Sequence, residues 1–190
     1  MLNNLNILLG VSGGIAAYKV VDLASKLTVA GAKVNTVMTE NACRLIGPPS
    51  FEAVTRSAVF TGLWNTPEEY KIGHIDLMDW ADIILVAPAT ANIIGKIANG
   101  ICDDLLSTTL CAAWRQIQSD VVFLAPAMNN NMWNNPAVQR NVTTVKEMGF
   151  QLIGPVEGRL ACGTEGIGRM SEPKDILKVV EKVAAKINKT

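Results

Sequence analysis

Three short segments of the chain combine small and polar residues in patterns that could do chemistry. They are Gly10-Val-Ser-Gly-Gly14, Pro88-Ala-Thr-Ala-Asn92 and Pro126-Ala-Met-Asn129. Each segment follows or closes a run of apolar residues that is typical of a buried strand. In an open α/β sheet, ligands bind beyond the carboxyl ends of the strands. The sequence therefore predicts that these three segments meet at one ligand site.

The glycine turn at 10–14 is compatible with several motifs. It matches the G-x-S-x-G nucleophile elbow of hydrolases, but that motif needs a histidine partner, and His74 is the only histidine of the chain. It matches the dinucleotide fingerprint imperfectly, with Ser12 at the third position and Ile15 at the sixth, although Glu40 could imitate the ribose-binding acid. Both motifs expose backbone N–H groups at a helix N-terminus, which suits one phosphate. A tight turn without a ligand remains the alternative.

Two further residues are candidates for proton transfer. His74 carries the one imidazole, whose ordinary pKa lies near neutrality, although a lone histidine is more often a surface or capping residue. Cys162 stands in a glycine-rich segment, where a thiol can be accessible enough to react. Cys102 and Cys111, by contrast, are expected to be buried structural cysteines.

Asn129 follows a predicted strand and could offer a carboxamide to a bound polar group. An asparagine-rich turn is the ordinary alternative, because asparagine is common in turns. Met132 and Trp133 could equally be apolar anchors of that turn.

Composition restricts the class of protein. The 17 basic residues balance the 17 acidic ones, so the chain lacks the charge that non-specific binding to nucleic acid or to an anionic membrane needs. Hydrophobic residues make up 49% of the sequence, which indicates a core-rich globular chain. No apolar run is long enough for a membrane span, and the first residues do not resemble a secretory signal. We expect a single domain over 1–190, with no metal site and no disulfide framework, in the cytoplasm.

The chemical segments need strands and helices to position them. Apolar runs predict strands at Leu5–Val11, Lys33–Met38, Asp82–Ala87, Val121–Leu124 and Gln151–Ile153. Helical spacing and end signals predict helices up to Gly31 and over Ala91–Asn99, Asp103–Trp114, Pro136–Met148 and Pro173–Ile187. Unbroken apolar strands that alternate with helices indicate an α/β fold with one doubly wound, mainly parallel sheet and helices on both faces. The segment Glu157–Met170 is expected to be a long loop.

Four ordered segments together resemble the flavin-dependent cysteine decarboxylases, and most closely the branch that acts in coenzyme A biosynthesis. They are Ser12-Gly-Gly-Ile15, His74-Ile-Asp-Leu77, Pro126-Ala-Met-Asn129 with Met132-Trp133, and the run from Ala161-Cys-Gly163 to Gly168-Arg-Met170. The segment from Pro88 to Asn92, followed by Lys96 and Asp103-Asp104, resembles the flavin-contacting part of that family. The resemblance spans nearly the whole chain and implies a Rossmann-like flavoprotein fold.

The resemblance also implies a role for individual residues. His74 would be the base and Cys162 the proton donor, while Asn129 and Met132 would position the substrate. A flap over the substrate would contain Arg159, Leu160 and Ala161. The cofactor FMN would be bound by Gly13, Gly14, Ile15, Thr39, Asn41, Thr90, Ala91, Asn92 and Ala127.

The implied reaction is the decarboxylation of 4'-phosphopantothenoylcysteine. Oxidation of the substrate thiol to a thioaldehyde, with hydride passing to FMN, would make the loss of carbon dioxide possible, and the later return of the hydride would leave no net oxidation. The implied partners are further copies of the chain, as a homotrimer or as a dodecamer built from trimers, and a phosphopantothenate-cysteine ligase, fused or separate. Peptidyl-cysteine decarboxylases of lantibiotic synthesis are the nearest alternative, ahead of a flavin prenyltransferase and of a purely regulatory flavoprotein.

Overall fold

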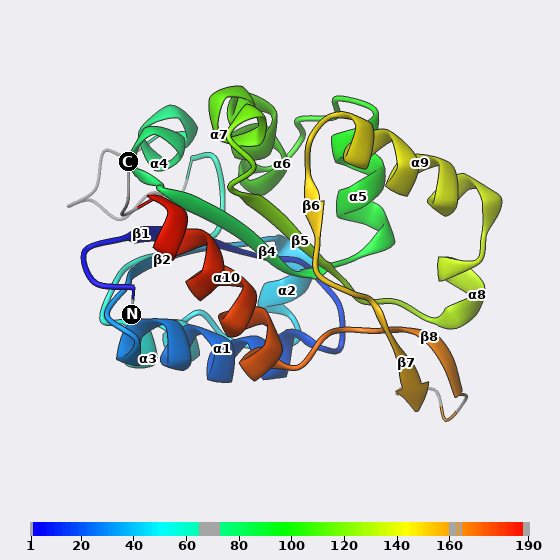
Figure 1. Cartoon of the computed structure of the whole chain (residues 1–190), viewed down its shortest axis with the longest axis horizontal. Coiled ribbons are helices and arrows are strands. Elements are labelled where there is room, and N and C mark those ends of the chain that lie inside the picture. The colour runs from blue at the N-terminus through cyan, green and yellow to red at the C-terminus, as the bar shows by residue number, and fades with distance from the viewer. Residues whose placement is uncertain (1, 65–72, 160–162, 164, 188–190) are drawn as a thin grey trace.

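A parallel six-stranded sheet lies at the centre of the structure, which is a computed structural model that describes residues 2–64, 73–159, 163 and 165–187 (Figure 1). The strand order is β3-β2-β1-β4-β5-β6, and every neighbouring pair is parallel. The strands are β1 (Asn6–Val11), β2 (Lys33–Met38), β3 (Val59–Phe60), β4 (Ile83–Ala89), β5 (Val122–Pro126) and β6 (Gln151–Leu152). This arrangement confirms the predicted α/β fold with a parallel sheet.

Helices cover both faces of the sheet. One face packs against α1 (Ala17–Val29), α3 (Pro49–Thr55) and α10 (Pro173–Ile187) (Figure 1). The other face packs against α4 (His74–Trp80), α5 (Ala91–Ala98), α6 (Leu105–Ala112), α7 (Trp114–Gln118) and α9 (Pro136–Glu147). Two short helices, α2 (Glu40–Cys43) and α8 (Asn130–Trp133), follow β2 and β5.

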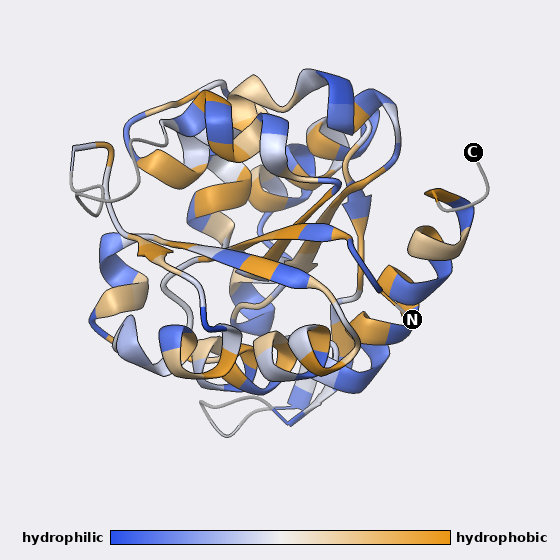
Figure 2. Ribbon diagram, turned by 90° about the vertical axis from the view of Figure 1, so that its left-hand side faces the viewer, coloured by the Kyte–Doolittle hydropathy of each residue, from blue (hydrophilic) through white to orange (hydrophobic). Residues whose placement is uncertain are grey.

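The two hydrophobic cores arise from the alternation of side chains along buried strands. Ile7 and Leu9 of β1 belong to the core beneath α1 and α10, whereas Leu8 belongs to the core beneath α4 and α6. Figure 2 shows the strands largely in hydrophobic colours between helices that carry hydrophilic residues on their outer sides. Burial of both sheet faces explains why the strands read as continuous apolar runs.

A two-stranded antiparallel hairpin, β7 (Val156–Arg159) and β8 (Glu165–Arg169), projects beyond the main sheet (Figure 1). The prediction of a long loop over this segment was therefore wrong. Gly158, Gly166 and Gly168 take φ values of 152°, 155° and 145°, a conformation that glycine adopts easily. The glycines that suggested a loop instead allow the hairpin to form and to approach other backbone closely.

Several element boundaries differ from the prediction. Strand β4 continues through Pro88 to Ala89, because its pairing with β5 shifts register between Val86 and Ala89 and so accommodates a residue without an N–H. Helix α6 ends at Ala112 and a separate helix α7 follows. The predicted strand at Gln151–Ile153 is one residue longer than β6, and the predicted helix at Pro173–Ile187 has the same bounds as α10.

The two cysteines expected to be buried are both exposed. Cys102 precedes α6, and Cys111 lies on α6 away from the apolar face that Leu105, Leu106 and Leu110 form against the sheet. The prediction failed because a helix that is rich in apolar residues does not reveal which of its faces is outermost. Within the residues described, no helix is long and apolar enough to cross a membrane.

Candidate functional site

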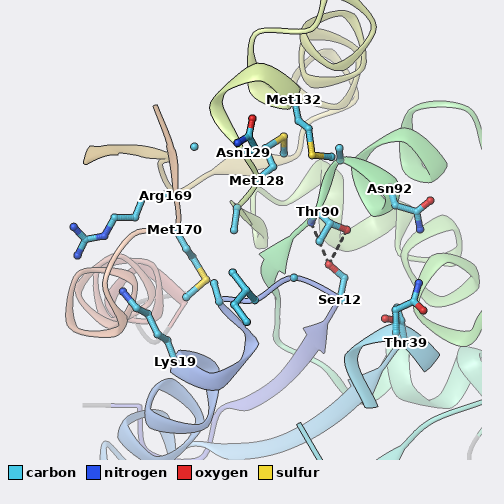
Figure 3. A pocket seen from close by; sticks show the side chains of 18 of the residues that line it. Ser12, Lys19, Thr39, Thr90, Asn92, Met128, Asn129, Met132, Arg169 and Met170 are labelled. Carbon is cyan, nitrogen blue, oxygen red and sulfur yellow. Dashed lines mark hydrogen bonds between the residues drawn. The ribbon is translucent and has the colours of Figure 1, made fainter. Parts of the chain in front are cut away.

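A cavity of about 830 Å³ lies beyond the carboxyl ends of β1, β2, β4 and β5 (Figure 3). The three segments that the sequence singled out all contribute to its wall, together with the N-terminal part of α1 and the hairpin. Its lining residues are Ser12, Gly13, Gly14, Ile15, Ala16, Tyr18, Lys19, Thr39, Glu40, Asn41, Thr90, Ala91, Asn92, Lys96, Asp103, Asp104, Ala127, Met128, Asn129, Met132, Arg159, Gly168, Arg169 and Met170. The volume is in the range of pockets that hold small molecules and cofactors.

Ser12 connects two of the segments through hydrogen bonds. Its Oγ donates to the carbonyl oxygen of Pro88 at 2.6 Å and accepts from the backbone N–H of Thr90 at 3.1 Å. The same Oγ lies 3.0 Å from Thr90 Oγ1, and Ser12 is only 2% exposed. A hydroxyl that is buried and hydrogen-bonded to two backbone groups is a poor nucleophile. The structure therefore gives no support to the hydrolase interpretation.

The glycine turn forms part of the cavity wall, next to the starts of α1 and α5. A Cβ on Gly13 would lie 2.4 Å from Asn41 Cβ, and a Cβ on Gly14 would lie 3.1 Å from Thr90 Cγ2, so only glycine fits at Gly13 without a shift. Helix α1 begins three residues after Gly14, and α5 begins at Ala91 with Thr90 as its cap. The first N–H groups of a helix have no acceptor within it. The wall therefore offers neutral donors that suit a phosphate group.

Lys96 is the central cation of a compact ion cluster on another part of the cavity wall. Its Nζ lies 2.5 Å from Asp103 Oδ1 and 2.6 Å from Asp104 Oδ2. Burial opposes the charge on Lys96, but the hydrogen bonds and charges of the two carboxylates outweigh it and raise the pKa of Lys96 above its ordinary value. Lys96 thus stays charged, and the cluster carries an excess of negative charge.

A second ion cluster joins α1, β8 and the start of α10. Lys19 Nζ lies 2.9 Å from Glu172 Oε1, and Arg169 pairs with the same oxygen. The hydrogen bond from Lys19 is the main reason that the pKa of Glu172 is lowered, and the hydrogen bond from Arg169 adds to it. Lys19 and Arg169 line the cavity, whereas Glu172 does not. The side chains of Lys19 and Arg169 therefore border the cavity, and both pair with the one carboxylate of Glu172, which is not part of the lining.

The hairpin packs on the asparagine segment at the far wall of the cavity. The backbone N–H of Met128 donates to the carbonyl oxygen of Gly168 at 2.9 Å, and a Cβ on Gly168 would lie 2.3 Å from Met128 O. Asn129 caps α8, with its Oδ1 accepting from the N–H of Asn131 at 2.8 Å. Figure 3 shows Asn129 and Met132 together at this wall, across from Thr39 and Ser12. Their positions are therefore set by β5 and by the hairpin.

The structure brings most of the expected site residues together. All nine residues expected to bind a flavin line the cavity, and so do Asn129, Met132 and Arg159; the nine are Gly13, Gly14, Ile15, Thr39, Asn41, Thr90, Ala91, Asn92 and Ala127. Leu160, Ala161 and Cys162 lie outside the described residues. His74, the half-buried first residue of α4, is not part of the lining within the described chain.

Sequence reasoning gave no role to Lys19 or to Arg169. Lys19 stands five residues after Gly14, in the first turn of α1, and this spacing could have placed it beside the glycine turn. Arg169 was part of a quoted motif, but its placement depends on the hairpin that was predicted as a loop. Glu172 could not be found at all, because its partner Lys19 is 153 residues away in the sequence.

Comparison with known proteins places the chain among flavoproteins. Residues 1–185 match the family model described as Flavoprotein. The chain is 53% identical over 182 residues to the coenzyme A biosynthesis bifunctional protein CoaBC of Bacillus subtilis (strain 168), and the match covers 96% of this chain and 44% of that protein. It is 43% identical over 175 residues to the CoaBC protein of Haemophilus influenzae, and this match covers 92% of this chain and 42% of that protein. The chain thus spans less than half the length of these curated relatives.

Solved structures show the same relationship. A PPC decarboxylase mutant complexed with pantothenoylaminoethenethiol aligns with a TM-score of 0.81 and 35% identity, covering 94% of this chain and 97% of that one. The FMN-dependent cysteine decarboxylase SpaF aligns with a TM-score of 0.78 and 34% identity, covering 97% and 99%. With a family model matched over nearly its whole length and a relative above half identity, this chain belongs to the flavoprotein family.

Proposed function

We propose that this chain is an FMN-dependent decarboxylase that converts 4'-phosphopantothenoylcysteine to 4'-phosphopantetheine in coenzyme A biosynthesis. The observation that carries the proposal is the single cavity that joins the glycine turn to Asn129 and Met132. The similarity to CoaBC proteins and to a PPC decarboxylase supports the choice of substrate. The proposal treats 1–190 as one flavin-binding decarboxylase domain in the cytoplasm.

The residues that line the cavity fit FMN. Gly13 and Gly14 let the turn pack closely against Asn41 and Thr90, which border the same cavity, and the N–H groups at the start of α1 and α5 suit the cofactor phosphate. Thr39 and Asn41 at the end of β2 and Asn92 at the start of α5 add polar groups around it. When bound, FMN supplies reversible hydride acceptance, which lets a cysteine carboxylate leave as carbon dioxide.

The residues of the chain would then orient the substrate and manage protons. The carboxamide of Asn129, held by the α8 cap, would bind the amide of the substrate next to the reacting cysteine. His74 would act as the general base that takes the proton of the substrate thiol. In the return half of the reaction, Cys162 would supply the proton that, together with the returned hydride, gives the saturated thiol.

In this proposal, His74 would reach a cavity of this kind in a second copy of the chain. It begins α4 outside the lining, so we propose a homo-oligomer in which His74 completes the site of a neighbouring subunit. Ile15, Tyr18 and Met132 on the cavity wall are 63%, 61% and 48% exposed, and a neighbouring subunit would cover this apolar surface. A closed homotrimer, alone or as one of the four trimers of a dodecamer, would give every cavity one histidine.

The supplier of the substrate would be a phosphopantothenate-cysteine ligase. The curated relatives are bifunctional, and the chain matches only 44% and 42% of the two longer proteins compared above. We propose that the ligase is fused to this domain or acts as a separate partner.

A comparison of two substrates tests the proposal against its nearest alternative. The purified holoenzyme is given 4'-phosphopantothenoylcysteine in one reaction and a peptide with a C-terminal cysteine in another. We expect decarboxylation of the first to the saturated thiol, with little turnover of the peptide. Turnover of the peptide alone, ending at the ene-thiol, would instead assign the chain to the peptidyl-cysteine decarboxylases.

A further inference from the structure

We infer that Cys102 and Cys111 form a dithiol that a low-molecular-weight disulfide oxidises reversibly to an intramolecular disulfide bond, and that this bond weakens the binding of FMN. The inference assigns a modification site to two thiols that lie outside the lining of the cavity and take no part in the proposed reaction. It rests on FMN as the cofactor and not on the proposed substrate. Cys102 directly precedes Asp103, which belongs to the cavity lining.

The side chains of the two cysteines meet on the outer side of α6. The thiols of Cys102 and Cys111 are hydrogen-bonded to each other, and both residues are exposed. Thr108 stands one turn before Cys111 on the same side of α6. Its Oγ1 lies 3.2 Å from the carbonyl oxygen of Cys102 and 2.7 Å from that of Asp104, so the segment before α6 is held against this side of the helix. Two thiols are thus kept in contact where a small oxidant can reach them.

The pair lacks the further ligands of a metal centre. The part of the chain that the structure describes contains no group of three or more His, Cys, Asp or Glu side chains that could hold a metal ion. A structural zinc site takes four ligands of this kind. Two accessible thiols in contact are instead the reactants of a disulfide.

The oxidation consists of two thiol–disulfide exchanges. One protein thiolate attacks a sulfur atom of the small disulfide, which forms a mixed disulfide and releases one small thiol. The second protein thiolate attacks the sulfur atom of the first cysteine, which forms the Cys102–Cys111 bond and releases the second small thiol. The protein loses two electrons and two protons, and the small disulfide gains them.

The surroundings of Cys102 make this exchange slow. Partial burial raises the pKa of Cys102, and the hydrogen bond and charge of Cys111, followed by the charges of Asp103 and Asp104, raise it further. The thiolate is the attacking form, so a raised pKa limits the rate of exchange. We therefore expect oxidation over minutes to hours.

Closing the bond disturbs the cavity wall next to Cys102. A disulfide brings its sulfur atoms to about 2 Å, whereas hydrogen-bonded atoms stay at about 2.5 Å or more, so Cys102 must move toward α6. Asp104 is fixed at the start of α6, because its Oδ1 accepts from the N–H of Ser107 at 2.8 Å. The displacement therefore falls on Asp103 and on its 2.5 Å contact with Lys96 Nζ. Lys96 and Asp103 both line the cavity that fits FMN.

Oxidation and FMN binding are then linked reciprocally. If the disulfide weakens FMN binding by some factor, FMN makes the disulfide harder to form by the same factor, because the two equilibria belong to one cycle. Coupling between two sites is typically about 5- to 150-fold. We expect a factor of about 10, which lowers the reduction midpoint of no form but separates the midpoints of the apoprotein and the holoprotein by about 30 mV.

Oxidation of the apoprotein with glutathione disulfide, followed by titration with FMN, tests the inference. Proteolysis and mass spectrometry should identify a Cys102–Cys111 crosslink that is two hydrogens lighter than the dithiol and that dithiothreitol reverses. The oxidised protein should bind FMN about 10-fold more weakly than the reduced protein. Cys111→Ser should bind FMN like the reduced wild type before and after oxidation. Cys43→Ser is the matched control, since it removes the half-buried thiol of α2 and keeps the pair, so its FMN affinity should still respond to oxidation.

Other outcomes contradict the inference. Failure to react, or a mixed disulfide with glutathione that does not close, shows that the two thiols are not a redox pair. Equal FMN affinity of the oxidised and reduced proteins, or equal dithiol–disulfide equilibria in glutathione buffers with and without FMN, overturns the link to the cavity. A loss of affinity that persists in Cys111→Ser assigns the effect to another thiol, and Cys102→Ser replaces this variant if it does not fold. An apoprotein that binds no FMN in either form overturns the cofactor assignment and the link with it, whereas failure of the proposed substrate alone leaves both measurements intact.

Discussion

Ser12 Oγ donates a 2.6 Å hydrogen bond to the carbonyl oxygen of Pro88, although 76 positions separate the two residues in the sequence. This contact, together with the N–H of Thr90, links the turn after β1 to the end of β4. The two segments are neighbours because β1 and β4 are adjacent parallel strands that end at the same edge. The relative position of the glycine turn and the start of α5 therefore depends on Ser12.

The Ser12→Ala variant should be less stable and should bind FMN more weakly. It leaves the carbonyl of Pro88 and the N–H of Thr90 without their buried partner, which costs about 1–3 kcal/mol of unfolding free energy. Urea denaturation of the apoprotein measures this cost, and Thr143→Ala on the exposed side of α9 is the control, expected to change stability by less than about 0.5 kcal/mol. Equal stability of both variants would show that the Ser12 bonds do not hold the turn.

The wild-type protein should purify with non-covalent FMN, and Gly13→Ala should abolish that binding. The added Cβ would lie 2.4 Å from Asn41 Cβ, so the turn and α2 must move apart where the cofactor is expected. The measurement is the flavin absorbance of each protein and the titration of its apo form with FMN. Gly95→Ala on α5 is the control, because its Cβ would meet Asn141 Nδ2 at an ordinary 3.4 Å. A colourless wild type that does not bind added FMN would contradict the cofactor assignment.

Variants of His74 and Cys162 should stop the reaction at different points. If His74 is the base of the first half, His74→Asn should lower carbon dioxide release by about 10²- to 10⁴-fold. If Cys162 acts only in the return half, Cys162→Ser should still release carbon dioxide but leave an oxidised product two hydrogens lighter than the thiol. Mass spectrometry of the products separates the two cases. Normal amounts of saturated thiol from Cys162→Ser would remove Cys162 from the mechanism.

Two inactive variants should restore activity when their subunits are mixed. His74→Asn keeps an intact cavity, whereas Asn129→Ala keeps an intact histidine on α4. If His74 serves the cavity of a neighbouring subunit, unfolding and refolding an equal mixture should recover about a quarter of the wild-type activity, since about that share of sites combines one intact part from each subunit. Activity no higher than that of the separate variants would place His74 and Asn129 in the same subunit's site.

The sequence predicted five of the six strands of the sheet and one wall of the site, because both depend on local patterns; the two-residue strand β3 was not predicted. Apolar runs such as Lys33–Met38 identify strands that are buried on both faces, and the residues that follow them must meet at one edge. The hairpin was missed because Gly158, Gly166 and Gly168 are typical loop residues in a local pattern. Their place in the hairpin depends on the pairing of the two strands and, for Gly168, on close contact with Met128. Lys19 and Glu172 are joined only by the packing of α1 near α10, which no short segment of the sequence reveals.

The central claim is that the chain decarboxylates its substrate without net oxidation. The ratio of thiol product formed to carbon dioxide released tests this claim most directly. The holoenzyme is incubated without oxygen and without added electron donor or acceptor, in the presence of an excess of 4'-phosphopantothenoylcysteine. Carbon dioxide and the thiol product are both quantified, the latter by mass. The account predicts many turnovers, with one 4'-phosphopantetheine formed for each carbon dioxide released. Release of no carbon dioxide, or of only as much as the bound flavin could accept in a single turnover, would contradict it.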